Sequence, residues 1–163
     1  SLSSDSLSLN FDMASFFRDY LESVASEEDA AGSLPDVVPD IRYGGRPGDM
    51  AWSTVGIQLA TMLHTHFGDQ RAAEENMDLM VRQVDSLTER VKGGVKACAT
   101  CSGASGQCEH GDWCPPPTKQ GGAYPDVPGV CGGTTPSLCV TSSFAYLNAV
   151  QQLAELAQVV GNT

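Results

Sequence analysis

The segment from about residue 70 to residue 92 constrains the fold most, because its apolar residues recur at the spacing of an α-helix. They alternate steps of four and three: Ala73, Met77, Met80, Val84, Leu87 and Val91. This spacing places them on one face of a helix. Gly68 and Asp69 precede the segment, the first as a helix stop and the second as a cap for the next helix. A connection this short between two helical segments predicts an antiparallel helical hairpin.

Three other segments share this periodicity, and no strand pattern of useful length interrupts them. Asn10 is a good N-cap for the first, and Gly161 ends the last. We therefore expect a mainly α fold. Its predicted helices cover about 11–25, 51–67, 70–92 and 141–160, joined by long loops at 32–50 and 94–140. Loops of this length suit one end of a helical toroid better than a four-helix bundle.

The charge of the chain narrows the class of partner. Nine lysines and arginines stand against 20 aspartates and glutamates, a net charge of -11. Such a surface repels phosphate groups, so we expect no nucleic-acid partner. No apolar run is long enough to cross a bilayer, so we expect no membrane insertion. The acidic run Glu27, Glu28 and Asp29 is interpreted as a solvated helix end.

All six cysteines fall in one Gly/Pro-rich loop, and two interpretations are open. An even number in such a loop predicts up to three disulfides and hence an extracellular or secretory-pathway location. The candidates are Cys98, Cys101, Cys108, Cys114, Cys131 and Cys139. The alternative is a zinc site that also uses His110. That site would lack two regular knuckles and leave two cysteines over, so we favour disulfides, with no metal and no cofactor.

Both tryptophans stand close to acidic residues. Trp52 follows Asp49, and Trp113 follows Asp112 with Glu109 nearby. A flat aromatic face with carboxylates beside it is typical of a sugar-binding pocket, where apolar walls combine with a few polar groups. The alternative is structural: a tryptophan at the edge of the core, next to an aspartate that caps a helix.

Five motifs in one order resemble the catalytic domain of bacterial-type α-L-rhamnosidases, glycoside hydrolase family 78. They are NFDMASFFRDYL (10–21), GSLPDVVPD (32–40), AWSTVGIQLATMLHTHFGDQRAAEENMDLM (51–80), HGDW (110–113) and TSSFAYLNAVQQLAELAQVVG (141–161). The resemblance covers nearly all of the chain outside the cysteine-rich loop. Residues 1–163 are accordingly interpreted as part of a catalytic-like domain, with a cysteine-rich insertion at 94–140.

The resemblance implies part of a six-hairpin α/α toroid with a sugar pocket built by loops at one end. It also implies an inverting glycosidase acting on terminal rhamnose, in which one carboxyl group protonates the leaving oxygen and another activates water. Carried over to this chain, Trp113 would pack against the sugar, Asp112 would support the pocket and Trp52 would form a second wall. Glu109 matches no family role.

The chain departs from the family in two respects. In the family, the catalytic acid lies just before the segment that resembles 10–21, and the base lies after the one that resembles 141–161. Neither region occurs here, so we expect no catalytic residue in this chain and no activity from it alone. The family also commonly has Gly-Asp where Ser53 and Thr54 stand. Two functions follow: a segment of a rhamnosidase-like hydrolase that works with the remainder of its domain, or a secreted, disulfide-stapled helical module that binds carbohydrate or supports an assembly.

Overall fold

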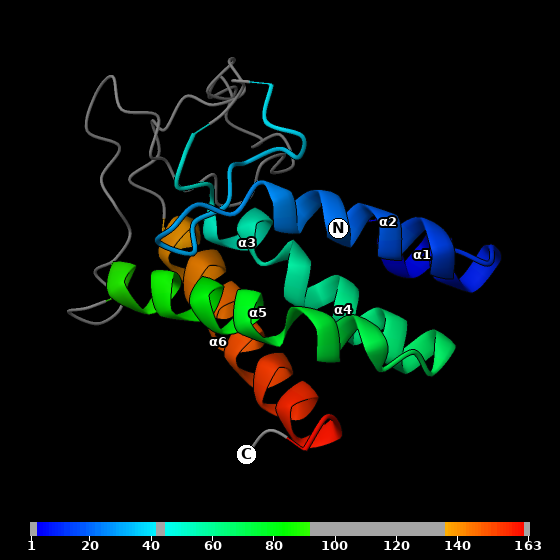
Figure 1. The fold of residues 1–163 in the computed structure, drawn as a ribbon. Helices are drawn as coiled ribbons and strands as arrows, with labels where there is room; N and C mark the ends of the chain where they lie inside the picture. The colour runs from blue at the N-terminus through cyan, green and yellow to red at the C-terminus, as the bar shows by residue number, and fades with distance from the viewer. Residues whose placement is uncertain (1–2, 42–44, 92–135, 162–163) are drawn as a thin grey trace.

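The computed structural model describes residues 3–41, 45–91 and 136–161, with side chains from residue 141 onward in the last range. Its described residues form helices and no strand (Figure 1). The helices are α1 (Ser4–Asn10), α2 (Ala14–Ser26), α3 (Met50–Ser53), α4 (Val55–Phe67), α5 (Arg71–Arg90) and α6 (Pro136–Val159). The predicted mainly α architecture is confirmed.

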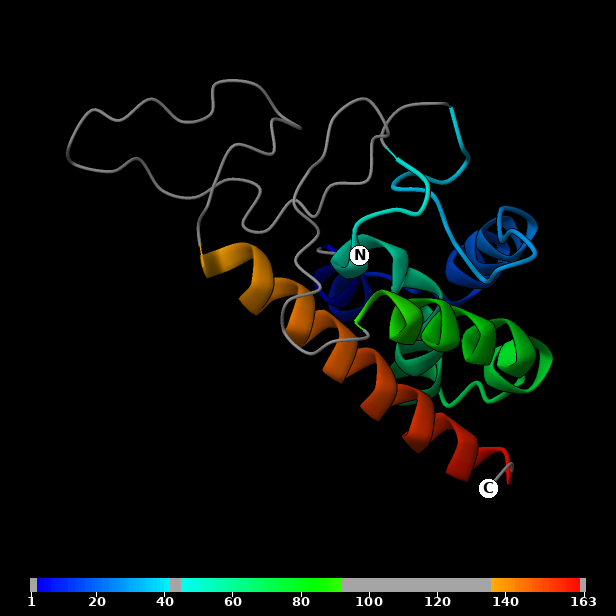
Figure 2. The ribbon, with the colours of Figure 1, turned by 90° about the vertical axis from the view of Figure 1, so that its left-hand side faces the viewer.

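The helix α4 is the centre of the molecule, because every other described helix contacts it. Figures 1 and 2 show α2 and α6 on different sides of α4, with α5 packed beside it. The core is built on this helix, where Ile57, Ala60 and Leu63 are fully buried. From α2, Leu21 and Val24 pack into the same cluster, and Met80 joins it from α5. Seven of its thirteen residues are buried, on more than one face, which explains its central position.

The turn between α4 and α5 forms as the sequence predicts. Gly68 adopts a left-handed conformation, with φ 65°. Its N–H donates to the carbonyl of His64 at 2.9 Å, which is the bond of an αL C-cap, and the N–H of Asp69 donates to the carbonyl of Leu63 at 3.1 Å. The Asp69 carboxylate then accepts the N–H of Arg71 at 3.1 Å. Hydrogen bonds from the Arg71 side chain hold the pKa of Asp69 below its ordinary value, so this carboxylate is charged at neutral pH. The N-cap position of α5 is Gln70, one residue after the predicted cap.

The helices α4 and α5 run in opposite directions, so the turn that joins them and the loop before α3 lie at opposite ends. The turn at 68–70 lies at the far end of α4 and α5 (Figure 1). The end of α2, the short helix α3, the end of α5 and the start of α6 all lie toward the opposite end, on the left in Figure 1. The segment 27–49 emerges at this second end, which is therefore the loop end of the helical array.

Three helix boundaries differ from the prediction for local reasons. Asn10 ends a helix instead of capping the next one: its side-chain amide donates to the carbonyl of Ser6 in α1. Thr54 divides the predicted helix 51–67, because its hydroxyl bonds to the Ala51 carbonyl and to the side chain of Gln58. The last helix starts at Pro136, five residues before the predicted position, and proline is favoured in the first turn of a helix.

The helix α6 packs against the core with small residues at the centre of its contact face and larger ones beside them. Tyr146, Leu153, Ala157 and Val160 are half-buried and pack against the core clusters. The buried residues are Ser142, Ala145, Ala149 and Leu156, which are mostly small and let α6 approach α4 and α5 closely. Phe144 and Leu147 are exposed on the same helix, at 69% and 54%. Thus α6 also has apolar side chains on a second face, which the other described helices do not cover.

Candidate functional site

Trp52 lies at the loop end of the helices and lines a groove. It is the third residue of α3, directly before α4, and its side chain is half-buried. The groove has a volume of about 490 Å³ and runs between α1, α2, the loop at 35–38, α3 and α4. Binding sites for small molecules are commonly 300–1,000 Å³ and mostly apolar, as this one is. Its lining includes Phe16, Phe17, Tyr20, Asp36, Val38 and Trp52.

An aromatic pair from α2 forms one wall of this groove. The rings of Phe16 and Tyr20 are stacked, with centroids 6.4 Å apart and an interplanar angle of 11°. Phe16 is 58% exposed, so its ring presents apolar surface to solvent. The Tyr20 hydroxyl donates to the carbonyl of Val38 at 3.4 Å, and burial raises the pKa of Tyr20, which keeps this donor protonated. Neither residue is among the predicted site residues, although their i, i+4 spacing is visible in the sequence.

The carboxylates next to Trp52 hold backbone groups. Asp49 is 3% exposed and is the N-cap of α3, since its Oδ1 accepts the N–H of Ala51 at 2.7 Å. Asp36 accepts the N–H groups of Gly45 and Asp49. The structural interpretation of Trp52, beside a capping aspartate, is therefore correct for Asp49. It does not exclude the sugar-binding interpretation, because Trp52 also lines the groove.

The acidic run at the end of α2 is not a solvated helix end, contrary to expectation. The side chain of Glu28 is only 4% exposed and pairs with Arg82 of α5. Arg46 donates to the carbonyls of Glu27 and Ser33 at 2.8 and 2.9 Å, and its guanidinium lies 3.5 Å from the Glu27 carboxylate. These contacts fasten the loop to α2 and α5. Arginines distant in sequence provide them, so helical periodicity gave no sign of them.

The other predicted site residues lie outside the described part of the chain. Asp112, Trp113 and the cysteines 98, 101, 108, 114 and 131 all fall between residues 92 and 135. Cys139 lies within α6, but its side chain is not among those described. The sugar-facing role of Trp113 and the disulfides therefore stay predictions.

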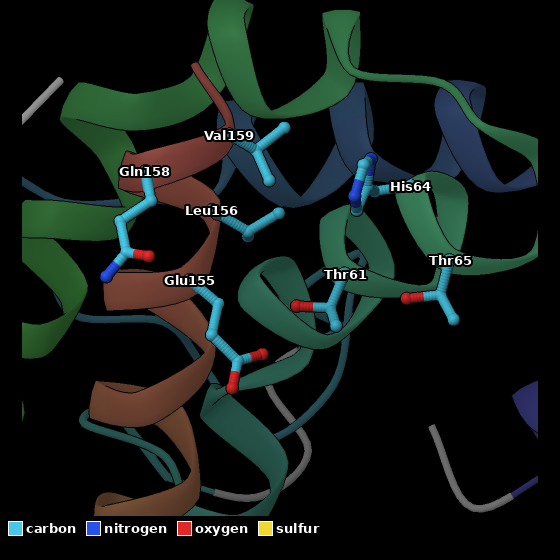
Figure 3. A pocket seen from close by; sticks show the side chains of 7 residues that line it. All are labelled: Thr61, His64, Thr65, Glu155, Leu156, Gln158 and Val159. Atoms are coloured by element: carbon cyan, nitrogen blue, oxygen red, sulfur yellow. The ribbon is translucent and has the colours of Figure 1, made fainter. Parts of the chain in front are cut away.

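A second hollow, of about 500 Å³, lies between the later turns of α4 and α6, away from Trp52 (Figure 3). Thr61 and His64 line it from α4, and Glu155 and Gln158 from α6. Leu156 and Val159 point from α6 toward α4. The Thr61 hydroxyl donates to the Ile57 carbonyl of its own helix at 2.9 Å. None of the predicted site residues lies here.

Within 3–41, 45–91 and 141–161, no three or more histidine, cysteine, aspartate or glutamate side chains are grouped so that they could hold a metal ion. Among the helices that the structure describes, none combines the length and apolar character needed to cross a membrane.

Comparison with known proteins identifies the family. Residues 1–163 match the bacterial alpha-L-rhamnosidase 6 hairpin glycosidase domain. An alpha-L-rhamnosidase of Formosa agariphila is 26% identical over 152 residues, which are 93% of this chain and 14% of that protein. The solved alpha-L-rhamnosidase from Dictyoglumus thermophilum matches with a TM-score of 0.75 and 29% identity, over 98% of this chain and 16% of that one.

The chain thus spans only 14% and 16% of these two relatives. The helical array fits part of an α/α toroid, and the predicted resemblance to bacterial rhamnosidases is confirmed. The match extends over every described helix and the loop end that carries Trp52. This chain belongs to the family of bacterial α-L-rhamnosidase six-hairpin glycosidase domains.

Proposed function

We propose that the chain is a segment of an α-L-rhamnosidase-like glycoside hydrolase that removes terminal rhamnose by an inverting mechanism. One observation carries the proposal: in a chain that matches the glycosidase family throughout, an aromatic groove along α1, α2 and α4 reaches Trp52 at the loop end of the helices. The face of Trp52 would pack against the apolar side of the deoxysugar and exclude water from it.

Inversion requires a general acid and a general base on opposite faces of the sugar, roughly 6.5–9.5 Å apart. Asp36, which lines the groove with Trp52, and Asp49, three residues before Trp52, accept backbone N–H groups instead. The proposal therefore gives them no proton-transfer role. It assigns the acid and the base to sequence outside residues 1–163, and it gives this chain the tasks of binding and orienting the sugar.

Thr54 supports a second candidate function, a non-catalytic module. It is 1% exposed, and its hydroxyl is bonded to the Ala51 carbonyl and to Gln58. The family carboxylate expected at this position is thus replaced by a group that turns inward. A secreted, disulfide-stapled descendant that binds carbohydrate without cleaving it would retain Trp52 and the groove while losing this acid.

The outer face of α6 supports a larger domain as the partner of this segment. Phe144 and Leu147 lie three residues apart on that face and are both largely exposed. In a toroid, consecutive helical hairpins pack side by side, so these side chains would be covered by neighbouring hairpins of the same domain.

Replacing Trp52 with alanine should weaken L-rhamnose binding by the 163-residue chain roughly tenfold, because the loss of one aromatic wall is expected to cost about 1–2 kcal/mol. Saturation-transfer NMR with increasing L-rhamnose measures the change. Phe144→Ala is the matched control: it removes an exposed aromatic ring on α6, outside the groove, and should bind as the original chain does. Equal binding by all three proteins would show that Trp52 does not contact the sugar.

A further inference from the structure

Asp36 joins two parts of the loop that are well separated in sequence. Its Oδ2 accepts the N–H of Gly45 at 2.6 Å, and its Oδ1 accepts the N–H of Asp49 at 2.7 Å. Its own N–H donates to the carbonyl of Gly45 at 3.1 Å. Hydrogen bonds to a charged carboxylate are stronger than those between neutral groups. Asp36 therefore holds the returning part of the loop, residues 45–49, against its outgoing part.

Asp49 carries this restraint to Trp52. The carboxylate of Asp49 accepts the N–H of Ala51, and its carbonyl accepts the N–H groups of Trp52 at 3.1 Å and Ser53 at 2.8 Å. The helix α3 has only four residues, too few to be stable by itself. The orientation of α3, and with it the direction of the Trp52 ring, depends on where Asp49 is held.

The backbone beside these two aspartates is packed too closely to shift easily. The N–H of Gly48 donates to the carbonyl of Leu34 at 2.7 Å. A Cβ added to Gly48 would lie 2.7–2.9 Å from backbone atoms of Pro35 and Asp36, closer than real Cβ contacts occur. Arg90 of α5 donates to the Gly48 carbonyl at 2.7 Å, which ties this crossing to the helical core.

We propose that Asp36 is a positioning residue for Trp52 and acts through the backbone and cap of Asp49. Asp36 sets the angle at which Trp52 faces the groove, and it takes no part in proton transfer. The effect on sugar binding rests on the proposed function, because it requires Trp52 to contact the sugar. The effect on the position of the Trp52 ring does not depend on the proposed function.

The first test measures the surroundings of Trp52 without any sugar. In a Trp113→Phe background Trp52 is the one remaining tryptophan, since the chain has two. Asp36→Asn keeps the size of the side chain but sets an NH₂ group against one of the two N–H donors. We expect its tryptophan emission to shift and acrylamide quenching to change, because the Trp52 ring is no longer held in one position.

Asp29→Asn is the matched control. Asp29 lies in the same loop, and its Oδ1 also accepts two backbone N–H groups, from Ala31 at 2.9 Å and Ser33 at 2.8 Å. Its hydrogen bonds in the described part of the chain stay within the loop, and its carboxylate lies 3.9 Å from the guanidinium of Arg46. Both variants should lose a similar few degrees in melting temperature, but only Asp36→Asn should alter the emission and quenching of Trp52. An equal change, or no change, in the two variants would overturn the positioning role.

If Asp36→Asn does not fold, a pair of Asp49 variants tests the link from Asp49 to Trp52, on which the positioning role of Asp36 depends. Asparagine caps helices about as well as aspartate does, whereas alanine cannot cap. Asp49→Asn should therefore leave the emission of Trp52 unchanged, and Asp49→Ala should shift it. The same emission from both would contradict the link from Asp49 to Trp52.

The second test returns to the original chain and adds L-rhamnose. Asp36→Asn should weaken binding roughly tenfold, the loss of about one charge-assisted hydrogen bond expressed as affinity. Asp29→Asn should bind as the original chain does. If the original chain binds no rhamnose, the proposed function fails, while the fluorescence result still decides whether Asp36 positions Trp52. If it binds and both variants bind equally well, the positioning role fails alone.

Discussion

Replacing Gly32 with alanine should lower the melting temperature by roughly 10 °C, from a loss of about 3–4 kcal/mol in the free energy of unfolding. Gly32 has φ 76°, where L-residues are strained, and it packs against α5. A Cβ at this position would lie 2.2 Å from the carbonyl oxygen of Arg82. Because that oxygen belongs to a helix backbone, the loop would have to move away from α5. Thermal unfolding followed by circular dichroism measures the effect.

Gly68→Ala separates backbone strain from this collision. Gly68 has a similar φ of 65°, but a Cβ there would meet nothing within 4 Å. Its replacement should cost only about 1 kcal/mol, or roughly 2–4 °C. Equal losses for the two variants would mean that the loop at 32 is not packed against Arg82.

Leu63→Ala should have an effect of similar size, lowering the free energy of unfolding by about 3 kcal/mol and the melting temperature by roughly 6–12 °C. Leu63 is fully buried at the centre of α4, in the cluster that α2, α5 and α6 share. Removing its side chain leaves a cavity that four packed helices cannot easily fill. Urea unfolding is the measurement, since a lower midpoint with an unchanged slope reports lost stability.

Leu147→Ala provides the control for Leu63 and also tests the larger domain. Leu147 is 54% exposed on α6, so the change should alter the stability of the 163-residue chain by no more than about 0.5 kcal/mol. In the longer polypeptide we expect a loss of about 2 kcal/mol, because neighbouring hairpins would bury this side chain. If Leu147→Ala changes the stability of neither the 163-residue chain nor the longer polypeptide, neighbouring hairpins do not cover this face of α6.

The elements predicted best are those whose periodicity and stop signals agree. The apolar spacing of 70–92 and the Gly68-Asp69 turn both require an antiparallel hairpin, and α4 and α5 form one. The predicted helix boundaries are wrong where a side chain forms a hydrogen bond within its own segment. Asn10 and Thr54 each use their own hydrogen bonds to end a helix, and apolar periodicity carries no record of such bonds.

The site could be predicted only in part, for a physical reason. Trp52 is predictable as a site residue because it stands close to Asp49 in the sequence, and Asp49 caps the helix that carries it. The other groove residues come from α1, α2 and the loop at 35–38, which only the packing of α2 on α4 brings near Trp52. The contacts of Glu28 with Arg82 and of Arg46 with Glu27 likewise join distant segments. Long-range pairs of this kind have no periodic signal in the chain.

The central claim is that this chain serves an α-L-rhamnosidase-like hydrolase whose acid and base lie outside residues 1–163. Hydrolysis of an aryl α-L-rhamnoside tests it most directly, with the 163-residue chain and the complete polypeptide of its gene assayed side by side. We expect the complete polypeptide to release the aryl group, with NMR showing an inverted rhamnose anomer, and the 163-residue chain to release none. Turnover by the 163-residue chain would contradict the placement of the acid and base, and an inactive complete polypeptide would contradict the hydrolase itself.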